Sequence, residues 1–467
     1  MALAYLAAGR WVGDGPAFSV VFPYDGTPTA EVTRADFAAM QEAVTCAAAE
    51  FARNDFAPAR RAGVLRRAAL LLAERAEDFA QTIVAEAGKT IRDARVEVKR
   101  AAGTLRLSAE EAERLGGEVV ALEHAAAGRF GVVRRFPVGP VLAITPFNFP
   151  LNLVCHKLGP AVAVGAPVVL KPSRKTPVSA LKLARLLIEA GLPERFLSVV
   201  PGSAEDADAL ARDARLAVLT FTGSAGVGWA LKAASPARRV LLELGGNAAC
   251  IVCADADLKR AVSRCVVAAF ANAGQVCISL QRILVERPAY EEFLDEFCRK
   301  ARKLRVGDPR EEATDVGPMV ESAAAERAAG WVEEALEGGA TAYLPLEVSG
   351  TLFSPCVLGG VDERMRVWSE EVFAPVVCVE PFDDFAEAVR RADDGRYGLQ
   401  AGLFTQNLRR VMYAHEKMRV GALLVNEVPT WRADAMPYGG AKDSGLGREG
   451  PRYVVEEMTE PRMLVLG

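Results

Sequence analysis

The stretch ELGGNAACIVCADADLKRAVSRCVVAAFANAGQVC, residues Glu243–Cys277, decides which fold and which chemistry this chain is expected to have. It begins with a carboxylate beside the pair Gly245-Gly246, and it ends with a thiol three residues after Gly274. Between the two ends, an apolar run over Ala248–Val252 predicts a strand, and apolar spacing from about Asp257 to Ala271 predicts a helix. We therefore expect a cysteine nucleophile and a glutamate that act on one reaction intermediate.

Short apolar strands alternate with helices on both sides of this stretch. Upstream, the pattern predicts the strands Val141–Thr145, Val168–Lys171, Leu197–Val200 and Ala217–Phe221, separated by helices over Leu151–Val164, Ala180–Ala190 and Ala204–Ala211. A second series runs from Ala249 to about Val425, with helices over Tyr290–Leu304, Ala323–Glu337 and Phe385–Ala392. This alternation is typical of parallel sheets covered by helices.

The flanking parts of the chain follow different patterns. Apolar spacings of three and four predict N-terminal helices over Ala35–Ala49, Ala59–Ala76, Glu77–Ala87 and Thr90–Ala112. Two strands, Glu118–Leu122 and Arg129–Pro137, are expected to form a hairpin joined by HAAAG, and the last strand is expected at Arg462–Leu466. A hairpin that protrudes from such a body is available for contact between subunits.

Composition excludes several classes of protein. The chain has 467 residues, enough for roughly two to four domains, and its 56 basic and 60 acidic side chains give a net charge of −4 without a basic surface for nucleic acid. The N-terminus lacks the basic region of a signal peptide, and the apolar run over 158–170 is interrupted by glycine and proline. We expect a cytoplasmic protein with no membrane or nucleic-acid partner.

Cysteine and histidine usage argues against a metal centre. The nine cysteines are scattered, which is unlike a disulfide framework. Cys250 and Cys253 form a C-x-x-C pattern inside an apolar strand, with no second pair to complete a zinc site. The three histidines, His124, His156 and His415, lie far apart in the sequence, so we expect no bound metal.

Two glycine-rich stretches could bind phosphate. Residues 445–450 match G-x-G-x-x-G, but no βαβ unit opens there and too little chain follows, so we interpret this motif as a loop. The stretch Phe221–Gly228 follows a strand and enters a helix, where free N–H groups face an anion. Ser224 can serve there as helix cap or as phosphate donor. Lys171 ends another strand at the edge where such sheets bind ligands, although it could also be a solvated lysine.

Taken together, these features resemble the aldehyde dehydrogenase superfamily over nearly the whole chain. The resemblance rests on seven motifs in order: PFNFP (Pro146–Pro150), VLKPS (Val169–Ser173), FTGS (Phe221–Ser224), ELGG (Glu243–Gly246), GQVC (Gly274–Cys277), EEVFAP (Glu370–Pro375) and PYGGAKDSGLGREG (Pro437–Gly450). It implies an α/β fold with two Rossmann-like parallel-sheet domains and a β oligomerisation arm. The implied cofactor domain covers 1–117 and 138–245, the catalytic domain 246–440, and the arm 118–137 and 441–467. A homodimer or homotetramer is implied.

The resemblance also implies an activity, the NAD(P)-dependent oxidation of an aldehyde to its acid. Cys277 matches the nucleophile, Glu243 the base, and Asn148 the amide that holds the oxyanion together with the Cys277 backbone N–H. Thiolate addition would give a thiohemiacetal, loss of hydride a thioester, and water activated by Glu243 would hydrolyse it.

The cofactor implied by the resemblance is NAD or NADP. Lys171 and Glu371 match ribose contacts, Ser224 matches a pyrophosphate contact, and Phe373 packs near the nicotinamide; the other implied contacts are Thr145, Pro146, Phe147, Ser173, Gly223, Val227, Leu244 and Gly245. Where NAD-preferring members commonly carry a glutamate, this chain has Arg174, followed by Lys175. Two cations there favour a 2′-phosphate, so we predict that NADP is used, unless Arg174 simply faces solvent.

The segments PLNLVCHKLGPA and NEVPTWRADAMPYGG resemble the lactaldehyde, phosphonoacetaldehyde and semialdehyde dehydrogenases, which implies a short, anionic or hydroxylated aldehyde. Arg106, His156 and Arg432 match positions that can bind the acidic end of such a substrate, although Arg106 could also be an ordinary surface charge. Val276 stands where some members have arginine, which weakens the case for a phosphonate.

Two alternatives remain open from the sequence. One is a CoA-acylating semialdehyde dehydrogenase, whose relatives often lack the ELGG glutamate, so that Glu243 favours hydrolysis. The other is a catalytically silent binding protein of the same fold, which would be expected to have lost Cys277, Glu243 or Asn148.

Overall fold

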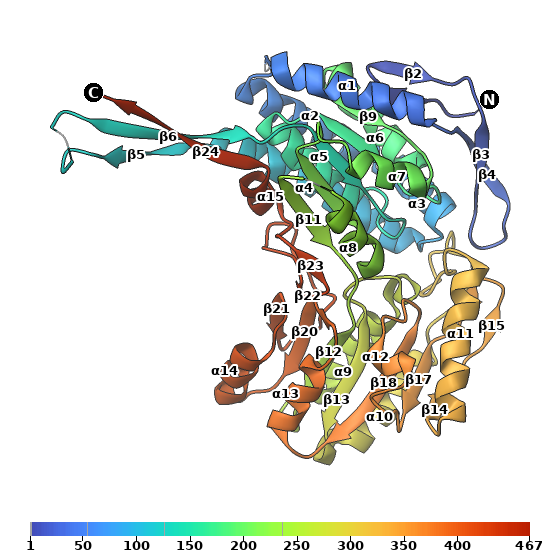
Figure 1. Ribbon diagram of the computed structural model, residues 1–467. Coiled ribbons are helices and arrows are strands. Elements are labelled where there is room, and N and C mark those ends of the chain that lie inside the picture. Colours follow the sequence, from blue (N-terminus) through green and yellow to red (C-terminus); the bar gives the residue numbers. More distant parts are fainter. Residues whose placement is uncertain (1, 54, 126, 236) are drawn as a thin grey trace.

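The computed structural model describes residues 2–53, 55–125, 127–235 and 237–467. Figure 1 shows two helix-covered sheets, one above the other, and a long arm that leaves the upper one. Both sheets are built mainly from parallel strands joined through helices, so the α/β class predicted from the sequence is confirmed.

The first sheet has the strand order β2-β1-β9-β8-β7-β10-β11-β23. Its five central strands are parallel and almost wholly buried, as expected when helices cover both faces. They are β9 (Leu197–Val199), β8 (Val168–Lys171), β7 (Val141–Ile144), β10 (Val218–Thr222) and β11 (Arg239–Glu243). Their carboxyl ends therefore share one edge of the sheet, and this edge faces the second unit (Figure 1).

The helices of this unit have identifiable start and stop signals. Thr90 caps α4 by accepting a hydrogen bond from Asp93 N, while Gly88 and Gly165 end α3 and α5 with left-handed φ angles of 69° and 83°. The helices are α1 (Phe37–Arg53), α2 (Pro58–Glu74), α3 (Ala76–Ala87), α4 (Ile91–Arg114), α5 (Asn152–Val164), α6 (Val178–Glu189), α7 (Ala204–Ala211), α8 (Ala225–Ala234) and α15 (Pro451–Glu457), with a short turn η1 (Glu194–Phe196). The predicted helices differ from these mainly at their ends.

Four N-terminal strands were not predicted. β1 (Tyr5–Ala7) and β2 (Arg10–Val12) form an antiparallel edge on the first sheet, and β3 (Ala17–Val21) pairs with β4 (Pro28–Thr33). These strands are short or largely exposed, so their residues lack the apolar run that marks a buried strand.

The second sheet has the order β14-β17-β18-β13-β12-β20-β21. Its strands are β12 (Ala248–Val252), β13 (Leu280–Glu286), β14 (Thr341–Leu344), β17 (Cys356–Gly359), β18 (Val376–Phe382), β20 (Gln400–Phe404) and β21 (Ala422–Val425). They are covered by α9 (Leu258–Phe270), α10 (Arg287–Ala301), α11 (Ser322–Glu337), α12 (Arg366–Ser369), α13 (Phe385–Asp393) and α14 (Leu408–Lys417). Two small ribbons, β15 (Val348–Ser349) with β16 (Leu352–Phe353) and β19 (Tyr397–Gly398) with β22 (Ala441–Lys442), lie outside it.

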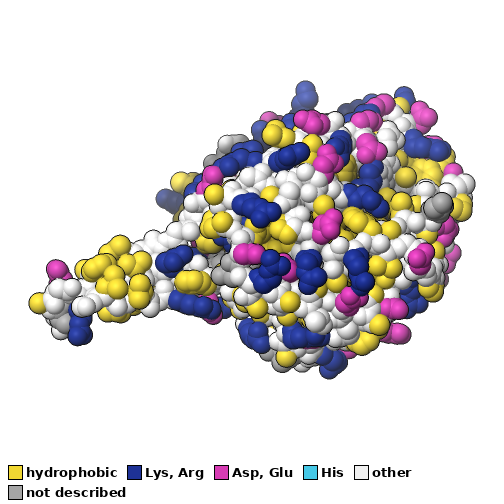
Figure 2. All heavy atoms as spheres, turned by 90° about the horizontal axis from the view of Figure 1, so that it is seen from above, with side chains coloured by type: hydrophobic (Ala, Val, Ile, Leu, Met, Phe, Trp, Pro, Cys, Tyr) yellow, Lys and Arg dark blue, Asp and Glu magenta, His cyan; other side chains and the backbone are white. Residues whose placement is uncertain are grey.

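The arm is a three-stranded antiparallel sheet of order β24-β6-β5. The predicted hairpin forms β5 (Gly117–Ala121) and β6 (Phe130–Pro137), and the C-terminal strand β24 (Thr459–Leu466) pairs along the whole of β6. Within the HAAAG connection, Ala126 lies outside the described residues. Figure 2 shows apolar side chains gathered on the projecting arm; the exposed ones include Val119, Phe130, Met463, Leu464, Val465 and Leu466.

The glycine motif at 445–450 was interpreted as a loop, which is wrong for its first two residues. Gly445–Leu446 forms β23, which pairs antiparallel with β11 so that Gly445 lies opposite Glu243. Leu244 N also donates to Ser444 O at 2.9 Å. Only β24 of the predicted arm segment 441–467 joins the arm, whereas β23 belongs to the first sheet. The chain thus returns to the first unit beside Glu243.

Among the described residues, no helix is long and apolar enough to cross a membrane. The same residues contain no cluster of three or more His, Cys, Asp or Glu side chains arranged to hold a metal ion.

Candidate active site

A cavity of about 370 Å³ lies at the shared carboxyl edge of β7, β10 and β11 and is closed on the other side by loops of the second unit. This is the edge at which open parallel sheets bind ligands. Cys277, Glu243 and Asn148, which the sequence separates widely, all line it. The structure therefore brings together the three residues expected to carry the chemistry.

The loop that presents Cys277 has an unusual backbone. After α9, Asn272, Ala273 and Gly274 have successive φ angles of 51°, 53° and 69°. A side chain at Gly274 would overlap the carbonyl of Ala374. Left-handed conformations cost non-glycine residues roughly 1–2 kcal/mol each, so the surrounding structure must enforce this turn. Strain of this kind gathers at functional sites.

Cys277 is the most accessible thiol of the chain, half-buried while the other eight cysteines are buried. Its Sγ lies 3.0 Å from the hydroxyl of Tyr438. Burial raises the pKa of the thiol to about 12, the Tyr438 hydrogen bond and the Arg432 charge lower it, and the carboxyls of Glu371 and Glu243 raise it. The thiolate thus depends on partners that stabilise its charge.

Glu243 ends β11 and is buried, with 6% of its surface exposed. Burial raises its pKa well above the usual range, and the nearby carboxylate of Glu449 adds to the shift, while Arg432 and Lys157 oppose it. Its Oε2 has no hydrogen-bond partner among the described residues. A raised pKa makes the ionised form of this carboxyl group a stronger base than an exposed glutamate, which suits proton transfer from water.

Asn148 follows β7 and is 5% exposed. Its Nδ2 donates to the carbonyl of Gln275 at 2.9 Å, which ties the amide to the loop that carries Cys277. Its Oδ1 has no partner within the described parts of the chain. The Asn148 amide and the Cys277 thiol line the same cavity, so an amide N–H donor is available to a ligand oxygen bound there.

Eight of the expected cofactor contacts line the same cavity: Pro146, Phe147, Gly223, Ser224, Leu244, Gly245, Glu371 and Phe373. The rings of Phe147 and Phe373 meet edge to face with centroids 6.0 Å apart. Glu371 accepts a hydrogen bond from Gly246 N at 3.0 Å, and burial raises its pKa to about 7. Side chains at Gly223 and Gly228 would overlap Phe221 and Leu244, so glycine at these positions allows the start of α8 to pack closely against the sheet.

The start of α8 fits a dinucleotide phosphate. Ser224 stands at the N-cap, yet its side chain makes no capping hydrogen bond, so the first N–H groups of the helix remain available. The hydroxyl of Thr222 is buried without a partner among the described residues. The site thus has donors suited to an anion.

The remaining expected cofactor contacts do not line the cavity: Thr145, Lys171, Ser173, Arg174 and Val227. Lys171 is buried at the end of β8, and burial lowers its pKa, as does Arg174, whereas Asp206 raises it. Arg174 is exposed, with its guanidinium 4.8 Å from the centre of the Phe18 ring. Val227 is 51% exposed on α8.

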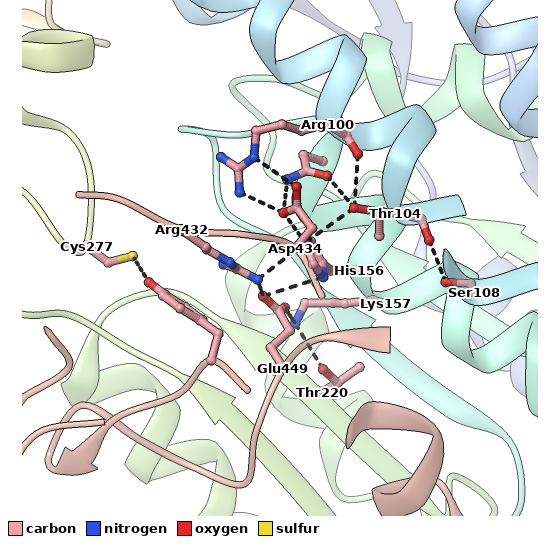
Figure 3. Close-up of polar contacts among 12 residues, drawn as sticks. Arg100, Thr104, Ser108, His156, Lys157, Thr220, Cys277, Arg432, Asp434 and Glu449 are labelled. Carbon is pink, nitrogen blue, oxygen red and sulfur yellow. Dashed lines mark hydrogen bonds and ion pairs between the residues drawn. The ribbon is translucent and has the colours of Figure 1, made fainter. Parts of the chain in front are cut away.

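The three expected substrate contacts are placed differently from one another. Arg106 does not reach the cavity; its side chain is 63% exposed and pairs with Glu110 at 2.7 Å. The arginine of α4 that lines the cavity is Arg100, which holds Asp434 with two hydrogen bonds of 2.7 and 3.1 Å (Figure 3). The surface-charge interpretation of Arg106 is therefore the one its geometry supports.

His156 is fully buried on α5 and does not line the cavity. Its Nε2 lies 2.9 Å from Asp434 Oδ1 and 3.3 Å from Arg432 Nη2. Burial lowers its pKa, opposed mainly by the charge of Glu449. His156 thus contacts Arg432, which lines the cavity, but does not line the cavity itself.

Arg432 does line the cavity, with 7% of its side chain exposed. It donates to Glu449 at 2.8 Å, and its guanidinium lies 3.6 Å from the centre of the Tyr438 ring. Arg100, Tyr438, Asp434 and Glu449 were not predicted as site residues from the sequence. Tyr438 and Glu449 stood in the quoted PYGGAKDSGLGREG motif, which was a usable signal.

Comparison with known proteins agrees with this geometry. Residues 11–464 match the model of the aldehyde dehydrogenase family. A 3-sulfolactaldehyde dehydrogenase of Priestia aryabhattai is 46% identical over 461 residues, covering 98% of this chain and 96% of that protein. The structure of aldehyde dehydrogenase 21 from Physcomitrella patens, in complex with the reaction product succinate, is 40% identical with a TM-score of 0.96, covering 99% of this chain and 98% of that one.

A second structure carries a cofactor. The glyceraldehyde-3-phosphate dehydrogenase GapN of Methanocaldococcus jannaschii, complexed with NADP, is 33% identical with a TM-score of 0.94, covering 97% of this chain and 100% of that one.

Proposed function

This chain belongs to the aldehyde dehydrogenase family and is an NAD(P)-dependent aldehyde dehydrogenase, and we propose that it oxidises a short aldehyde that carries an anionic group. The observation that carries the proposal is the pair of guanidinium groups, Arg100 and Arg432, in the wall of the cavity that holds Cys277. Planar guanidinium groups bind carboxylate, sulfonate and phosphate oxygens through paired hydrogen bonds.

The charge balance of the cavity supports an anionic substrate. Three arginines line it, Arg100, Arg327 and Arg432, against three glutamates, Glu243, Glu371 and Glu449. Burial raises the pKa of Glu371 to about 7 and that of Glu243 well above its usual range, so at neutral pH these two carboxyl groups carry less than their full charge. Asp434, outside the cavity, neutralises part of the charge of Arg100. The charge that remains on the cavity wall is positive and favours a negative ligand.

The names of the similar proteins agree with this substrate class. The three proteins compared above are named with a compound that carries a sulfonate, a carboxylate or a phosphate: 3-sulfolactaldehyde, succinate and glyceraldehyde 3-phosphate. We propose a hydroxylated or unsubstituted chain of similar length, with the aldehyde at Cys277 and the anion at the arginines.

Cys277, Asn148 and Glu243 each take part in a different step of the oxidation. Cys277 Sγ forms a bond to the aldehyde carbon while Asn148 donates to the oxygen that gains the electron pair; such a donor is worth about 3–4 kcal/mol. A nicotinamide ring, when bound, supplies the hydride acceptor. Glu243 then takes a proton from the water that attacks the thioester, and the acid and the thiol leave.

For the cofactor, we propose that NADP is preferred. Arg174 is exposed beside Lys171 at the carboxyl edge of the first sheet, so it is free to turn toward a 2′-phosphate. Lys175 adds a second cation, although it already pairs with Glu321. Asp206 is the acid close to Lys171, and it is engaged by the N-terminal cap of α7.

The CoA-acylating alternative gains no support, because Glu243 lines the same cavity as Cys277 and can serve hydrolysis. The silent binding protein is likewise not favoured, since Cys277, Glu243 and Asn148 are all present there.

For assembly, we propose a homodimer or homotetramer formed through the arm, whose exposed apolar side chains need a partner surface. A cytoplasmic location stays a prediction from the sequence.

A steady-state panel tests the proposal. Sulfonated, carboxylated and phosphorylated short aldehydes are compared with neutral aldehydes of equal length, each with NAD and with NADP. We expect kcat/KM to be highest for an anionic aldehyde with NADP, and Cys277→Ala to be inactive. A preference for neutral aldehydes contradicts the anionic substrate, a preference for NAD contradicts the cofactor assignment, and a CoA-dependent product contradicts hydrolysis.

A further inference from the structure

Tyr438 contacts the nucleophile, although neither its sequence motif nor the chemistry above gives it a role. It is 3% exposed and lines the cavity. Its hydroxyl lies 3.0 Å from Cys277 Sγ, and either group can donate this hydrogen bond while the thiol is protonated. Once the thiol loses its proton, only the phenol can donate.

The ring of Tyr438 is fixed by its surroundings. Its backbone pairs with Glu449 in an antiparallel bridge, in which Tyr438 N donates to Glu449 O at 3.0 Å. The guanidinium of Arg432 covers the ring at 3.6 Å from its centre. Such a cation over an aromatic face is attractive, more so when both are removed from water.

Arg432 is held in turn by groups that do not touch Cys277. Its Nη2 donates to Glu449 at 2.8 Å and lies 3.3 Å from His156 Nε2, which is 2.9 Å from Asp434 (Figure 3). His156 comes from α5, Arg432 and Asp434 from the loop before β22, and Glu449 from the turn between β23 and α15, and all four are largely buried. A continuous set of polar contacts therefore leads from His156 through Arg432 to the tyrosine at the thiol.

We propose that Tyr438 is the hydrogen-bond donor that positions Cys277 Sγ and stabilises its thiolate, with Arg432 holding the phenol in place. This rests on the proposed function in that Cys277 is the nucleophile. The phenol keeps its own proton throughout: the thiol proton leaves to solvent, the phenol O–H then donates to sulfur, and the thiolate electron pair forms the bond to the carbonyl carbon. No oxidant or further reactant is involved.

The charges around Cys277 show why such a donor is needed. Glu371, which precedes β18, and Glu243, which ends β11, disfavour the thiolate, while Arg432 and the Tyr438 hydroxyl favour it. Burial raises the pKa of Tyr438 itself well above its usual value, so the phenol remains protonated where enzymes work. Among these four groups, Tyr438 is the one that the structure shows in hydrogen-bond contact with sulfur.

The test measures the thiol in the enzyme without aldehyde or cofactor. Tyr438→Phe keeps the ring under Arg432 but removes the donor. Iodoacetamide alkylation of Cys277 is followed by mass spectrometry from pH 7 to pH 10, below the raised pKa of the thiol, where the rate at each pH is proportional to the thiolate present. The same protein carrying Cys277→Ser gives the background rate. We expect the thiol pKa to rise by about one unit, a tenfold loss of thiolate at a given pH. A more basic thiolate is also more nucleophilic, so alkylation should slow by roughly three- to tenfold.

The control is Tyr290→Phe, which removes a buried hydroxyl that donates to Val379 O at 3.3 Å, far from the cavity. Its alkylation profile should match that of the wild type. An unchanged alkylation rate in Tyr438→Phe overturns the proposal, and so does an equal loss of rate in Tyr290→Phe. The alkylation assay contains no aldehyde. If the wild type oxidises no aldehyde but its alkylation depends on Tyr438, the proposed function alone is refuted.

Discussion

Arg100 offers the sharpest test of how the substrate is recognised. We consider its replacement by methionine, which keeps most of the apolar stem and removes the guanidinium. The Arg100 side chain is 27% exposed and lines the cavity, so water screens its charge only in part. Asp434 loses two hydrogen bonds in the variant but keeps His156 as a partner.

The expected loss follows from the bond that Arg100 would make to an anionic substrate. A hydrogen bond between charged groups contributes about 1.5–3 kcal/mol. At about 1.36 kcal/mol for each factor of ten, kcat/KM for the anionic aldehyde should fall roughly 10- to 150-fold. A neutral aldehyde of equal length makes no such bond, and its kcat/KM should change less than about threefold by the same reasoning.

The assay is the ratio of kcat/KM for the anionic and the neutral aldehyde, which cancels any general loss of active enzyme. Arg106→Met is the matched control, since Arg106 stands on the same helix but pairs with Glu110 outside the cavity. An equal loss for both aldehydes in Arg100→Met refutes the reasoning. A change of ratio in Arg106→Met as large as that in Arg100→Met refutes it too.

Three further variants test how the structure holds the site. In Gly274→Ala, the new methyl group overlaps the carbonyl of Ala374 at a φ of 69°, so the thiol loop must shift, and a shift of about 1 Å should lower kcat about 100-fold. Glu97→Ala leaves Lys89 unpaired in the interior, where the two groups now lie 2.5 Å apart with at most 1% of either side chain exposed, and should lower the free energy of unfolding in urea by about 3–5 kcal/mol. Burial raises the pKa of Glu86 from 4.5 to about 7, so the folded wild type holds a proton that the unfolded chain releases. The free energy of unfolding of the wild type should therefore fall by about 3 kcal/mol between about pH 4 and pH 8. The Glu86→Gln variant has no such carboxyl group and should not show this fall.

Each of these variants has a control in the same chain. Gly103→Ala places a methyl group in open space within α4 and should leave kcat unchanged. Glu110→Gln removes an exposed carboxylate and should cost at most about 1 kcal/mol without a comparable pH dependence. Full activity in Gly274→Ala, a loss below about 1 kcal/mol in Glu97→Ala, or parallel pH profiles for wild type and Glu86→Gln would each contradict the corresponding argument.

The parts of the site that the sequence predicted are those whose position follows from local structure. Asn148, Ser224 and Glu243 each stand at or just after the end of a buried parallel strand, and such ends share one edge of a sheet. Cys277 lies in a glycine-containing turn that follows a helix. Short motifs fix these positions, and the family resemblance then indicates that the motifs converge.

The substrate side was harder because it depends on helix rotation. Arg100 and Arg106 are six residues apart on α4, and at about 100° and 1.5 Å per residue they point about 120° apart and lie roughly 9 Å apart along the axis. Arg100 lines the cavity, whereas Arg106 lies outside it with an exposed side chain. The sequence predicted that an arginine of this helix binds the substrate, but it did not show which side of the helix faces the cavity.

The family resemblance assigned His156 and Arg432 to one site, but residue spacing alone could not predict the partners of Arg432, because they come from distant parts of the chain. His156 lies on α5, whereas Glu449 follows β23 near the C-terminus. Nothing in the spacing of these residues indicates that they meet. The two-residue strand β23, which brings Glu449 to this position, is too short to produce a pattern.

The pairing of β23 with β11 also has a consequence for biosynthesis. Glu243 leaves the ribosome early, but its neighbour across the sheet, Gly445, is translated about 200 residues later, roughly 10–40 s at ordinary elongation rates. About the last 30 residues to be translated include Tyr438, Glu449 and the arm strand β24. A nascent chain can therefore complete most of both sheets and still lack a finished catalytic cavity, so premature termination in the final tenth of the message should yield inactive protein.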